Sequence, residues 1–257
     1  MAVTKASGVD MNGLELILDA DADTSITADT DDQIDIKVGG TDVITLTNSS
    51  LVLKGTTPTI TIGDAGAEDT KIVFDGNAQD FHIGLDDTDD DFKIGLGSAL
   101  GTTAHIVIDE TGAVTKPLQP AFQATATDQA NVTGDGTAVT PVYAERFDQN
   151  SDFDGTSTFT APVTGRYLIG VTTDIRGMAA ANTTGVVRIV TSNLTYPLVH
   201  MDIGNIIQDG NIVIGLGGTV LADFDAADTA TVLIDIRGAT QVVDLQTGGV
   251  FYACLLA

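Results

Sequence analysis

A run of oxygen-bearing side chains near the middle of the chain has the composition of a metal site. In DQNSDFDG every second position carries such a group, and the four residues are Asp148, Asn150, Asp152 and Asp154. Carboxylate and amide oxygens at alternate positions are the ligands of calcium-binding loops. In a loop that starts at Asn150 the twelfth position is Ala161, where such loops place a bidentate glutamate. Two interpretations remain: a calcium loop, or a turn whose polar side chains face water.

A second acidic run separates two copies of one apolar pattern in FHIGLDDTDDDFKIGLG, residues 81 to 97. Each copy alternates large apolar residues with other residues, namely Phe81, Ile83 and Leu85, then Phe92, Ile94 and Leu96. A period of two predicts two half-buried strands with these residues on one face and His82 on the outer face. The aspartates between them suit a solvated turn. Clustered carboxylates are also hard ligands for calcium, but no D-x-D-x-D-G loop closed by glutamate occurs here.

The sequence offers no recognisable catalytic motif. It lacks a G-x-S-x-G elbow, an HExxH pair, a Walker loop and a dinucleotide-binding fingerprint, and GLGG at 215 to 218 suits a turn. We therefore predict no enzyme activity, no catalytic residue and no cofactor other than the calcium considered above. Pairs of carboxylates that cleave glycans depend on geometry that a sequence hides, so a glycan-cleaving spike stays an alternative.

The net charge of the chain argues against anionic partners. The 257-residue chain has 36 Asp and Glu against 11 Lys and Arg, which gives a net charge of -25. Such a surface repels phosphate backbones and anionic lipid, so we expect no nucleic-acid partner. The N-terminal residues MAVTKASGVDMNG lack the apolar core of a signal peptide, and no run of eighteen apolar residues occurs. We expect synthesis in the cytoplasm and no membrane insertion.

The amino-acid composition of the chain changes near KPLQP, residues 116 to 120. All lysines lie at or before residue 116, all arginines lie after it, and its two prolines suit a connector. Before this point short alternating segments separated by polar turns predict an all-β region. Besides the two ladders, the predicted strands are IDIKV (34 to 38), VITLT (43 to 47), LVLKG (51 to 55), TITIG (59 to 63), KIVFD (71 to 75) and HIVID (105 to 109).

The first half carries too little apolar surface to close a core by itself. Only three phenylalanines precede residue 116: Phe74, Phe81 and Phe92. Burying one large apolar side chain contributes about 1.5 to 3 kcal/mol, against about 1 to 2 kcal/mol of backbone entropy for each ordered residue. Identical chains that turn their apolar faces to a shared axis would supply the missing surface. We predict a segment at 1 to 15, an intertwined trimeric β stalk of β-prism or β-helix type at 16 to 116, and a linker at 117 to 120.

The second half, residues 121 to 257, is richer in apolar and aromatic residues and again predicts only strands. These are AFQATA (121 to 126), STFTAP (157 to 162), GRYLIGVTTDI (165 to 175), VVRIVT (186 to 191), NIVIGLGGTVL (211 to 221), TATVLIDIRG (229 to 238) and GGVFYACLLA (248 to 257). Many short strands over this length indicate a β-sandwich or jelly roll. The last segment is apolar on both faces, which is typical of a central strand or a subunit contact.

The second half resembles the complement C1q and tumour-necrosis-factor superfamily of trimeric jelly rolls. FDQNSDFDGTSTFTAPVTGRYLIGV (147 to 171) is similar to that family's Phe-Asp start followed by F-x-x-P-x-x-G-x-Y, and GGVFYACLLA is similar to its closing segment. One departure is Ala227-Asp228 in place of the usual Gly-Asp. The resemblance implies a C1q/TNF-like jelly-roll knob at 121 to 257 that assembles as a homotrimer.

The first half resembles the stalks of bacteriophage tail fibres and related virion appendages, through DTDDQIDIKVGGTDVITLT (29 to 47) and residues 80 to 114. This resemblance implies a homotrimeric structural fibre on the exterior of a virion. Segment 1 to 15 would anchor it to other virion proteins, and the knob would bind a glycan or protein of the host surface. A capsid-bound head fibre or decoration protein is the first alternative, and the glycan-cleaving tailspike is the second.

Overall fold

The computed structural model describes residues 14 to 204 and 211 to 257, so most of the segment predicted to anchor the chain lies outside the described residues. Within them the chain forms strands and loops, and none of the secondary structure is helical. No stretch of these residues forms a helix suited to crossing a membrane. Two compact units meet between Gly66 and Ala67. Each unit is described by itself.

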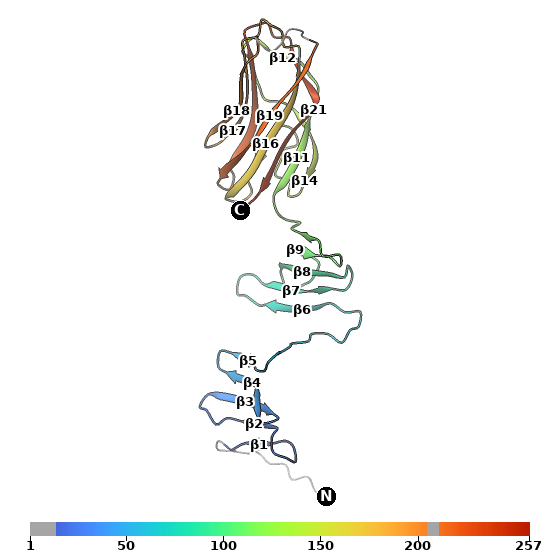
Figure 1. The fold of residues 1–257 in the computed structure, drawn as a ribbon, viewed down its shortest axis with the longest axis vertical. Helices are drawn as coiled ribbons and strands as arrows, with labels where there is room; N and C mark the ends of the chain where they lie inside the picture. The colour runs from blue at the N-terminus through green and yellow to red at the C-terminus, as the bar shows by residue number, and fades with distance from the viewer. Residues whose placement is uncertain (1–13, 205–210) are drawn as a thin grey trace. The chain divides into compact units, whose positions relative to one another are not determined.

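The first unit contains one antiparallel sheet in which each strand pairs with the next along the chain (Figure 1). We call this sheet the first meander; its strands are β1 (Leu16–Ile17), β2 (Ser25–Thr27), β3 (Gln33–Val38), β4 (Thr41–Thr47) and β5 (Leu51–Leu53). The predicted strands at 34 to 38, 43 to 47 and 51 to 55 are confirmed, whereas β1 and β2 were not predicted. Both are very short, so they offer too few residues for alternation to be recognised.

The strand predicted at TITIG, residues 59 to 63, is wrong. These residues form no strand, and Ile60 and Ile62 are exposed. An alternating pattern becomes a strand only where a neighbouring strand offers backbone hydrogen bonds, and Pro58 at its start has no N–H to donate. The segment runs instead as an extended connection toward the boundary of the unit.

The second unit begins with another sheet of the same kind, which we call the second meander. Its strands are β6 (Thr70–Phe74), β7 (Phe81–Asp86), β8 (Asp91–Leu96), β9 (Ala104–Ile108) and β10 (Val114–Thr115). The two predicted ladders form β7 and β8, and the acidic run makes the turn between them. Phe81 pairs with Leu96 and Leu85 with Phe92, so the repeated sequence aligns its two apolar sets on one face.

The rest of the second unit is a sandwich of two antiparallel sheets (Figure 1). The first sheet has the order β14-β11-β21-β16-β19, with β12 also paired to β21. Its strands are β11 (Ala121–Ala126), β12 (Gln129–Thr133), β14 (Tyr143–Asp148), β16 (Gly165–Arg176), β19 (Val213–Phe224) and β21 (Val243–Leu255). β21 lies between β11 and β16, which confirms the prediction of a central closing strand.

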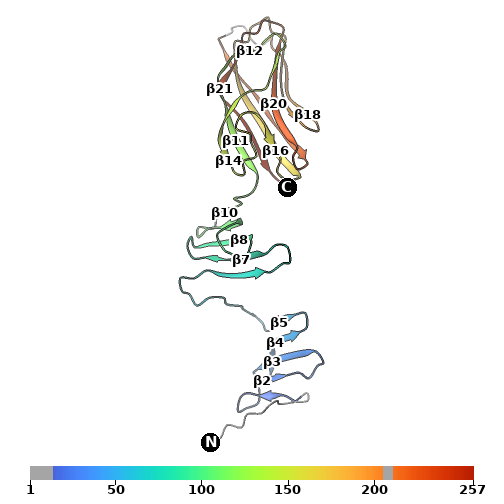
Figure 2. The same cartoon turned by 180° about the vertical axis from the view of Figure 1, so that it is seen from behind.

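The second sheet has the order β13-β20-β17-β18, with β15 also paired to β20 (Figure 2). Its strands are β13 (Ala138–Val139), β15 (Phe159–Thr160), β17 (Thr184–Thr191), β18 (Thr195–Asp202) and β20 (Thr229–Arg237). From β15 onward the chain passes back and forth between the two sheets, and only the β17–β18 hairpin stays within one. This arrangement is a jelly roll.

The core of the sandwich is built around stacked aromatic rings. The Phe122 ring lies 4.9 Å from that of Phe153, 5.2 Å from that of Phe159 and 5.1 Å from that of Phe251. Tyr167 joins this cluster through Phe159, at 5.5 Å between ring centroids. Buried isoleucines and valines of β17 and β20 belong to the same core. The sandwich therefore closes its own core within one chain.

The predicted linker is hydrogen-bonded to the sandwich. Gln119 donates its side-chain amide to the carbonyl oxygen of Leu255, and the Leu255 N–H donates to the carbonyl oxygen of Pro120 at 2.9 Å. The side-chain amide of Asn150 donates to the carbonyl oxygen of Leu118 at 3.1 Å. These bonds restrain the connector where it enters the sandwich.

Candidate assembly faces and acidic loops

The first meander has one apolar face, and within the described residues of its unit this face is largely exposed. The strand register places Ile26 beside Ile36, Ile36 beside Ile44, and Leu46 beside Leu51. Because residues two apart share a face, Ile34 and Leu53 also belong to it. Leu16 belongs to it through its pairing with Ile26. Ile34, Leu46 and Leu51 are exposed. We call this surface the first apolar face.

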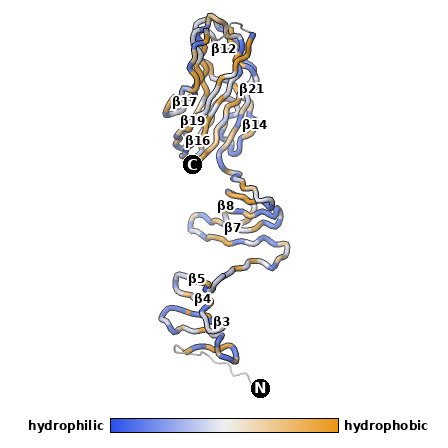
Figure 3. The backbone as a smooth tube through the Cα atoms, in the orientation of Figure 1, coloured by the Kyte–Doolittle hydropathy of each residue, from blue (hydrophilic) through white to orange (hydrophobic). Residues whose placement is uncertain are grey.

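The second meander repeats this arrangement with larger side chains. Rows of apolar residues run across its strands, and these rows are Ile72-Ile83-Ile94-Ile106, Phe74-Phe81-Leu96, and Leu85-Phe92-Ile108-Val114. Phe74 is 60% exposed, and Phe81, Leu85 and Phe92 are also exposed. Figure 3 shows orange, hydrophobic stretches along the strands of both meanders. We call this surface the second apolar face.

The opposite face of the second meander is polar and covered. Lys93, which is only 5% exposed, forms an ion pair with Asp86 at 2.8 Å and a second one with Asp89. The hydrogen bond from Lys93 lowers the pKa of Asp86, and the same bond raises the pKa of Lys93. The loop after β8 closes over this face, because a Cβ on Gly101 would lie 2.7 Å from the Asp86 carboxylate. The charged groups of this face therefore pair within one chain, while the buried His82 Nε2 has no hydrogen-bond partner among the described residues.

The prediction that His82 faces outward is wrong. His82 is 1% exposed, and its Nδ1 is hydrogen-bonded to the carbonyl oxygen of Gly97 at 2.9 Å. A Cβ on Gly95 would lie 2.7 Å from the imidazole ring, so glycine is what lets the ring lie against β8. Alternation showed that His82 and Phe81 lie on opposite faces. It did not show which face the loop after β8 would cover.

The first meander is organised in the same way. Asp35 is buried on its polar face and accepts hydrogen bonds from the Thr45 hydroxyl and the Gln33 side-chain amide. These bonds, led by the one from Thr45, lower the pKa of Asp35. Lys54 adds an ion-pair contact with Asp35 at 3.9 Å. In both meanders the buried charged groups of the polar side pair within one chain, whereas the residues of the apolar side are partly or fully exposed.

In the acidic loop at Asp148 to Gly155, two of the three carboxylates accept hydrogen bonds from the loop's own backbone, and the buried Asp152 Oδ2 has no hydrogen-bond partner among the described residues. Asp148 accepts from the N–H groups of Asn150 at 3.3 Å and Phe153 at 2.7 Å. Asp154 Oδ1 accepts from three successive N–H groups at 2.7 to 3.0 Å, and the donors are Thr156, Ser157 and Thr158. Burial and the charge of Asp148 raise the pKa of Asp152. This geometry is that of a hydrogen-bonded turn leading into β15.

The loop makes a testable contribution to acid stability. Burial opposes ionisation of Asp154, but the hydrogen bonds from Thr158, Ser157 and Thr156 outweigh it and hold its pKa at about 2. A carboxylate with a lowered pKa stabilises the fold above its unfolded pKa of about 3.9, and this contribution is lost as the pH falls toward 2. Between pH 4 and 2 we expect the free energy of unfolding of the native protein to fall by about 1 kcal/mol or less on account of this group, after solvent screening. The free energy of unfolding of Asp154→Ala should fall by a correspondingly smaller amount.

Thermal melts at pH 5 and pH 2.5 measure this difference. Asp152→Ala is the matched control, because the pKa of Asp152 is raised and its removal takes away no such acid-labile contribution. Equal acid losses in the native protein and Asp154→Ala would contradict the prediction. The calcium interpretation stays a separate prediction: if Asp148, Asn150, Asp152 and Asp154 hold calcium, a chelator lowers the melting temperature at neutral pH.

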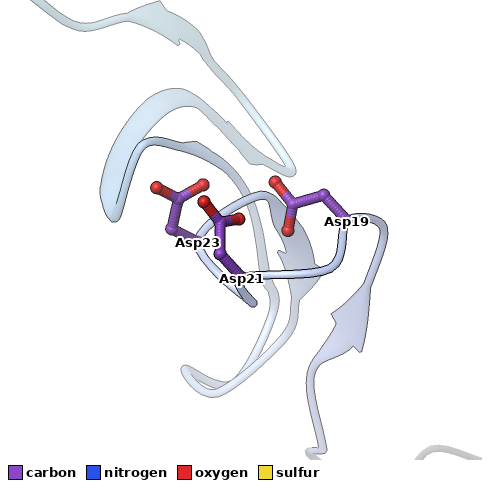
Figure 4. Close-up of side chains that lie close together, drawn as sticks. All are labelled: Asp19, Asp21 and Asp23. Carbon is purple, nitrogen blue, oxygen red and sulfur yellow. The ribbon is translucent and has the colours of Figure 1, made fainter.

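A further acidic group, which the sequence analysis did not single out, lies in the turn between β1 and β2. One carboxylate oxygen from each of Asp19, Asp21 and Asp23 lies within 4.8 Å of the others (Figure 4). The Thr24 N–H donates to Asp19 at 3.2 Å and its hydroxyl donates to Asp23 at 3.3 Å. The spacing D-x-D-x-D in DADAD was the available signal. Such a trio could hold a hard cation, but two of its members already accept hydrogen bonds from the turn.

Comparisons with known proteins place these features in context. No family model matches the chain, and no curated protein matches its sequence. Among solved structures, the globular domain of zebrafish complement 1qA is 16% identical, covers 54% of this chain and 98% of its own, and has a TM-score of 0.40. Murine APRIL at pH 8.0 is 10% identical over 54% of this chain and 99% of its own, with a TM-score of 0.35. PRD1 vertex protein P5 is 9% identical over 54% of this chain and 98% of its own, with a TM-score of 0.39.

Proposed function

We propose that this chain is a structural fibre protein of a bacteriophage virion, that it assembles as a homotrimer, and that it displays its jelly-roll knob to the host surface. The observation that carries the proposal is the pair of open apolar faces on the two meanders. Each meander pairs its buried charged groups within one chain and leaves its apolar rows partly or fully exposed. A second and third copy of the same chain are partners that always present the complementary surface.

The energetic argument favours assembly over an isolated stalk. An apolar side chain contributes about 1.5 to 3 kcal/mol when it is fully buried, and the apolar rows contribute little of this in one chain. Three copies arranged around an axis would turn the same rows into a shared core. The number three rests on the resemblance of residues 121 to 257 to trimeric jelly rolls. The virion context rests on the resemblance of the first half to fibre stalks. We expect no catalysis.

The proposal is tested by the mass of the full chain in solution and by its place on particles. Light scattering is expected to give three times the 26.5 kDa mass of one chain. Antibody labelling is expected to mark the exterior of virions, and a capsid rather than a tail position would select the head-fibre alternative. Particles that lack residues 121 to 257 are expected to adsorb poorly to host cells. A folded monomer whose meander amides resist hydrogen exchange would contradict the proposal.

A further inference from the structure

The outer face of the second sandwich sheet contains a groove that gathers positive charge. The groove has a volume of about 410 Å³, and its lining includes Arg188, Arg237, His200, Thr184 and Thr195. The sequence after residue 116 has five arginines, no lysine and one histidine, and two of those arginines and the histidine meet here. In a chain with a net charge of -25, two arginines that line one groove give it a local preference for anions.

The strand register explains why these residues meet. Across β20, β17 and β18, Arg237 lies beside Thr184, and Asp235 lies beside Val186, which in turn lies beside His200. Arg188 is two residues beyond Val186 on β17 and therefore faces the same side. The two arginines thus lie on either side of the row that contains Asp235. Figure 2 shows the β20 and β18 strands that carry this face.

A buried carboxylate holds the two guanidinium groups in place. Asp235 is 1% exposed, and its Oδ2 accepts from Arg237 Nε at 2.8 Å and from Arg237 Nη2. Arg188 Nη2 lies 3.5 Å from the same oxygen. Asp235 Oδ1 and Arg188 Nε are buried and have no hydrogen-bond partner among the described residues. Two positive groups share one negative group, so one positive charge in this trio is left uncompensated.

The size of the groove and the groups that line it suit a small ligand that carries a carboxylate. A guanidinium group presents several N–H donors in a fixed plane that matches a carboxylate, and ligand sites of small molecules span about 300 to 1,000 Å³. Val186 and Pro197 offer apolar surface, and Thr184 and Thr195 offer hydroxyl groups. A sugar ring with one carboxylate needs this combination: cations for the acid, hydroxyl partners, and an apolar surface for the C–H face.

We propose that the groove binds a carboxylate-bearing sugar residue, of the uronic acid or sialic acid type, in a surface glycan. The carboxylate lies between Arg188 and Arg237, and the sugar hydroxyls face Thr195 and His200 on β18. The biological role of this binding rests on the proposed function, in which the knob is displayed to the host surface.

Saturation-transfer NMR on the full chain tests the inference with D-glucuronate, D-glucose and inorganic phosphate as probes. We expect saturable binding of glucuronate, at least about tenfold weaker binding of glucose because it lacks the charge-assisted bonds, and little displacement of glucuronate by phosphate. A glucuronate polymer is expected to bind more tightly than the monosaccharide, because several residues can engage the assembled knobs. No transfer to glucuronate, equal binding of glucose, or full displacement by equimolar phosphate overturns the inference.

Variants locate the binding in the groove. Arg237→Gln leaves Arg188 to pair with Asp235 and is expected to weaken glucuronate binding about tenfold or more. Arg176→Gln, at an exposed arginine at the end of β16 in the other sheet, is the matched control and is expected to bind as the native protein does. If Arg237→Gln melts early, Val186→Glu replaces it, since a carboxylate added inside the groove should abolish binding of the anion. Binding that survives both variants overturns the assignment.

The result is independent of the assembly test. A trimer that does not bind glucuronate rejects the sugar assignment and leaves the fibre proposal standing. A monomer that binds glucuronate through Arg237 rejects the fibre proposal and leaves the groove assignment standing.

Discussion

Replacing Phe74 with aspartate is expected to abolish self-association of the chain, whereas replacing its neighbour Val73 with aspartate is expected to leave it intact. Both residues lie on the edge strand β6 and both are exposed in one chain, at 60% for Phe74 and 37% for Val73. They point to opposite sides of the strand. Phe74 pairs with Phe81 on the second apolar face, and Val73 pairs with His82 on the polar face.

The size of this effect follows from where the new charge would lie. If three chains bury their second apolar faces together, Phe74→Asp places three unpaired carboxylates in one apolar core. An unpaired buried charge costs several kcal/mol, and repulsion among three adds to that cost. Val73→Asp places its charge beside solvent and the polar face. We expect light scattering to report a monomer or aggregate for the first variant and the native mass for the second.

One outcome would contradict the prediction directly, and another would call for a further variant. A Phe74→Asp variant that keeps the native mass and melting temperature would show that the second apolar face is not an interface. Loss of assembly in both variants would show only that β6 does not tolerate a charge. In that case Leu85→Asp, on the same apolar face in the neighbouring strand β7, provides the second measurement.

Truncating Phe122 to alanine is expected to destabilise the knob by about 3 to 5 kcal/mol. Its ring contacts three other phenylalanines, and its side chain is 1% exposed. Removing it leaves a cavity that the rigid sheets on both sides cannot fill. Leu194→Ala, in the exposed hairpin between β17 and β18, is the control and is expected to change stability by no more than about 0.5 kcal/mol.

Tyrosine fluorescence can follow this unfolding, because the chain has no tryptophan and both Tyr143 and Tyr167 pack against phenylalanines of the core. Denaturant titrations must use one protein concentration throughout, since the stability of an assembled protein depends on it. A Phe122→Ala variant that unfolds within about 1 kcal/mol of the native protein would place the main core elsewhere.

Long alternating segments were predictable from the sequence, and short polar ones were not. The ladders of β7 and β8 and the long strands β16, β19 and β20 carry enough apolar residues for a period of two to be clear. QANVT and YAERFD form β12 and β14, but they are mostly polar and show no such period. β18 was missed because Pro197 interrupts it, and a proline lowers the expectation of a strand.

In the candidate sites, too, local features were predictable from the sequence and features that depend on tertiary structure were not. The sequence located the acidic run at Asp148, and the structure shows that Asp148 and Asp154 accept hydrogen bonds from N–H groups of the loop. It did not indicate that Arg188 and Arg237 share Asp235, because that arrangement depends on the pairing of β17 with β20, which are far apart along the chain. It also placed His82 on the wrong side, since the covering of one face by the loop after β8 is a tertiary effect.

The position of β21 sets the order in which this polypeptide can acquire structure during translation. Every strand of the two meanders pairs with a sequence neighbour, so those hairpins can form as soon as the ribosome releases them. The first sheet of the sandwich has to wait, because β11 pairs with β21 and the sheet has no centre until residues 243 to 255 have been made. A nascent chain therefore leaves the apolar residues of β11 without their partner strand until β21 has been made. We expect its need for chaperones to be greatest just before this last strand emerges from the ribosome.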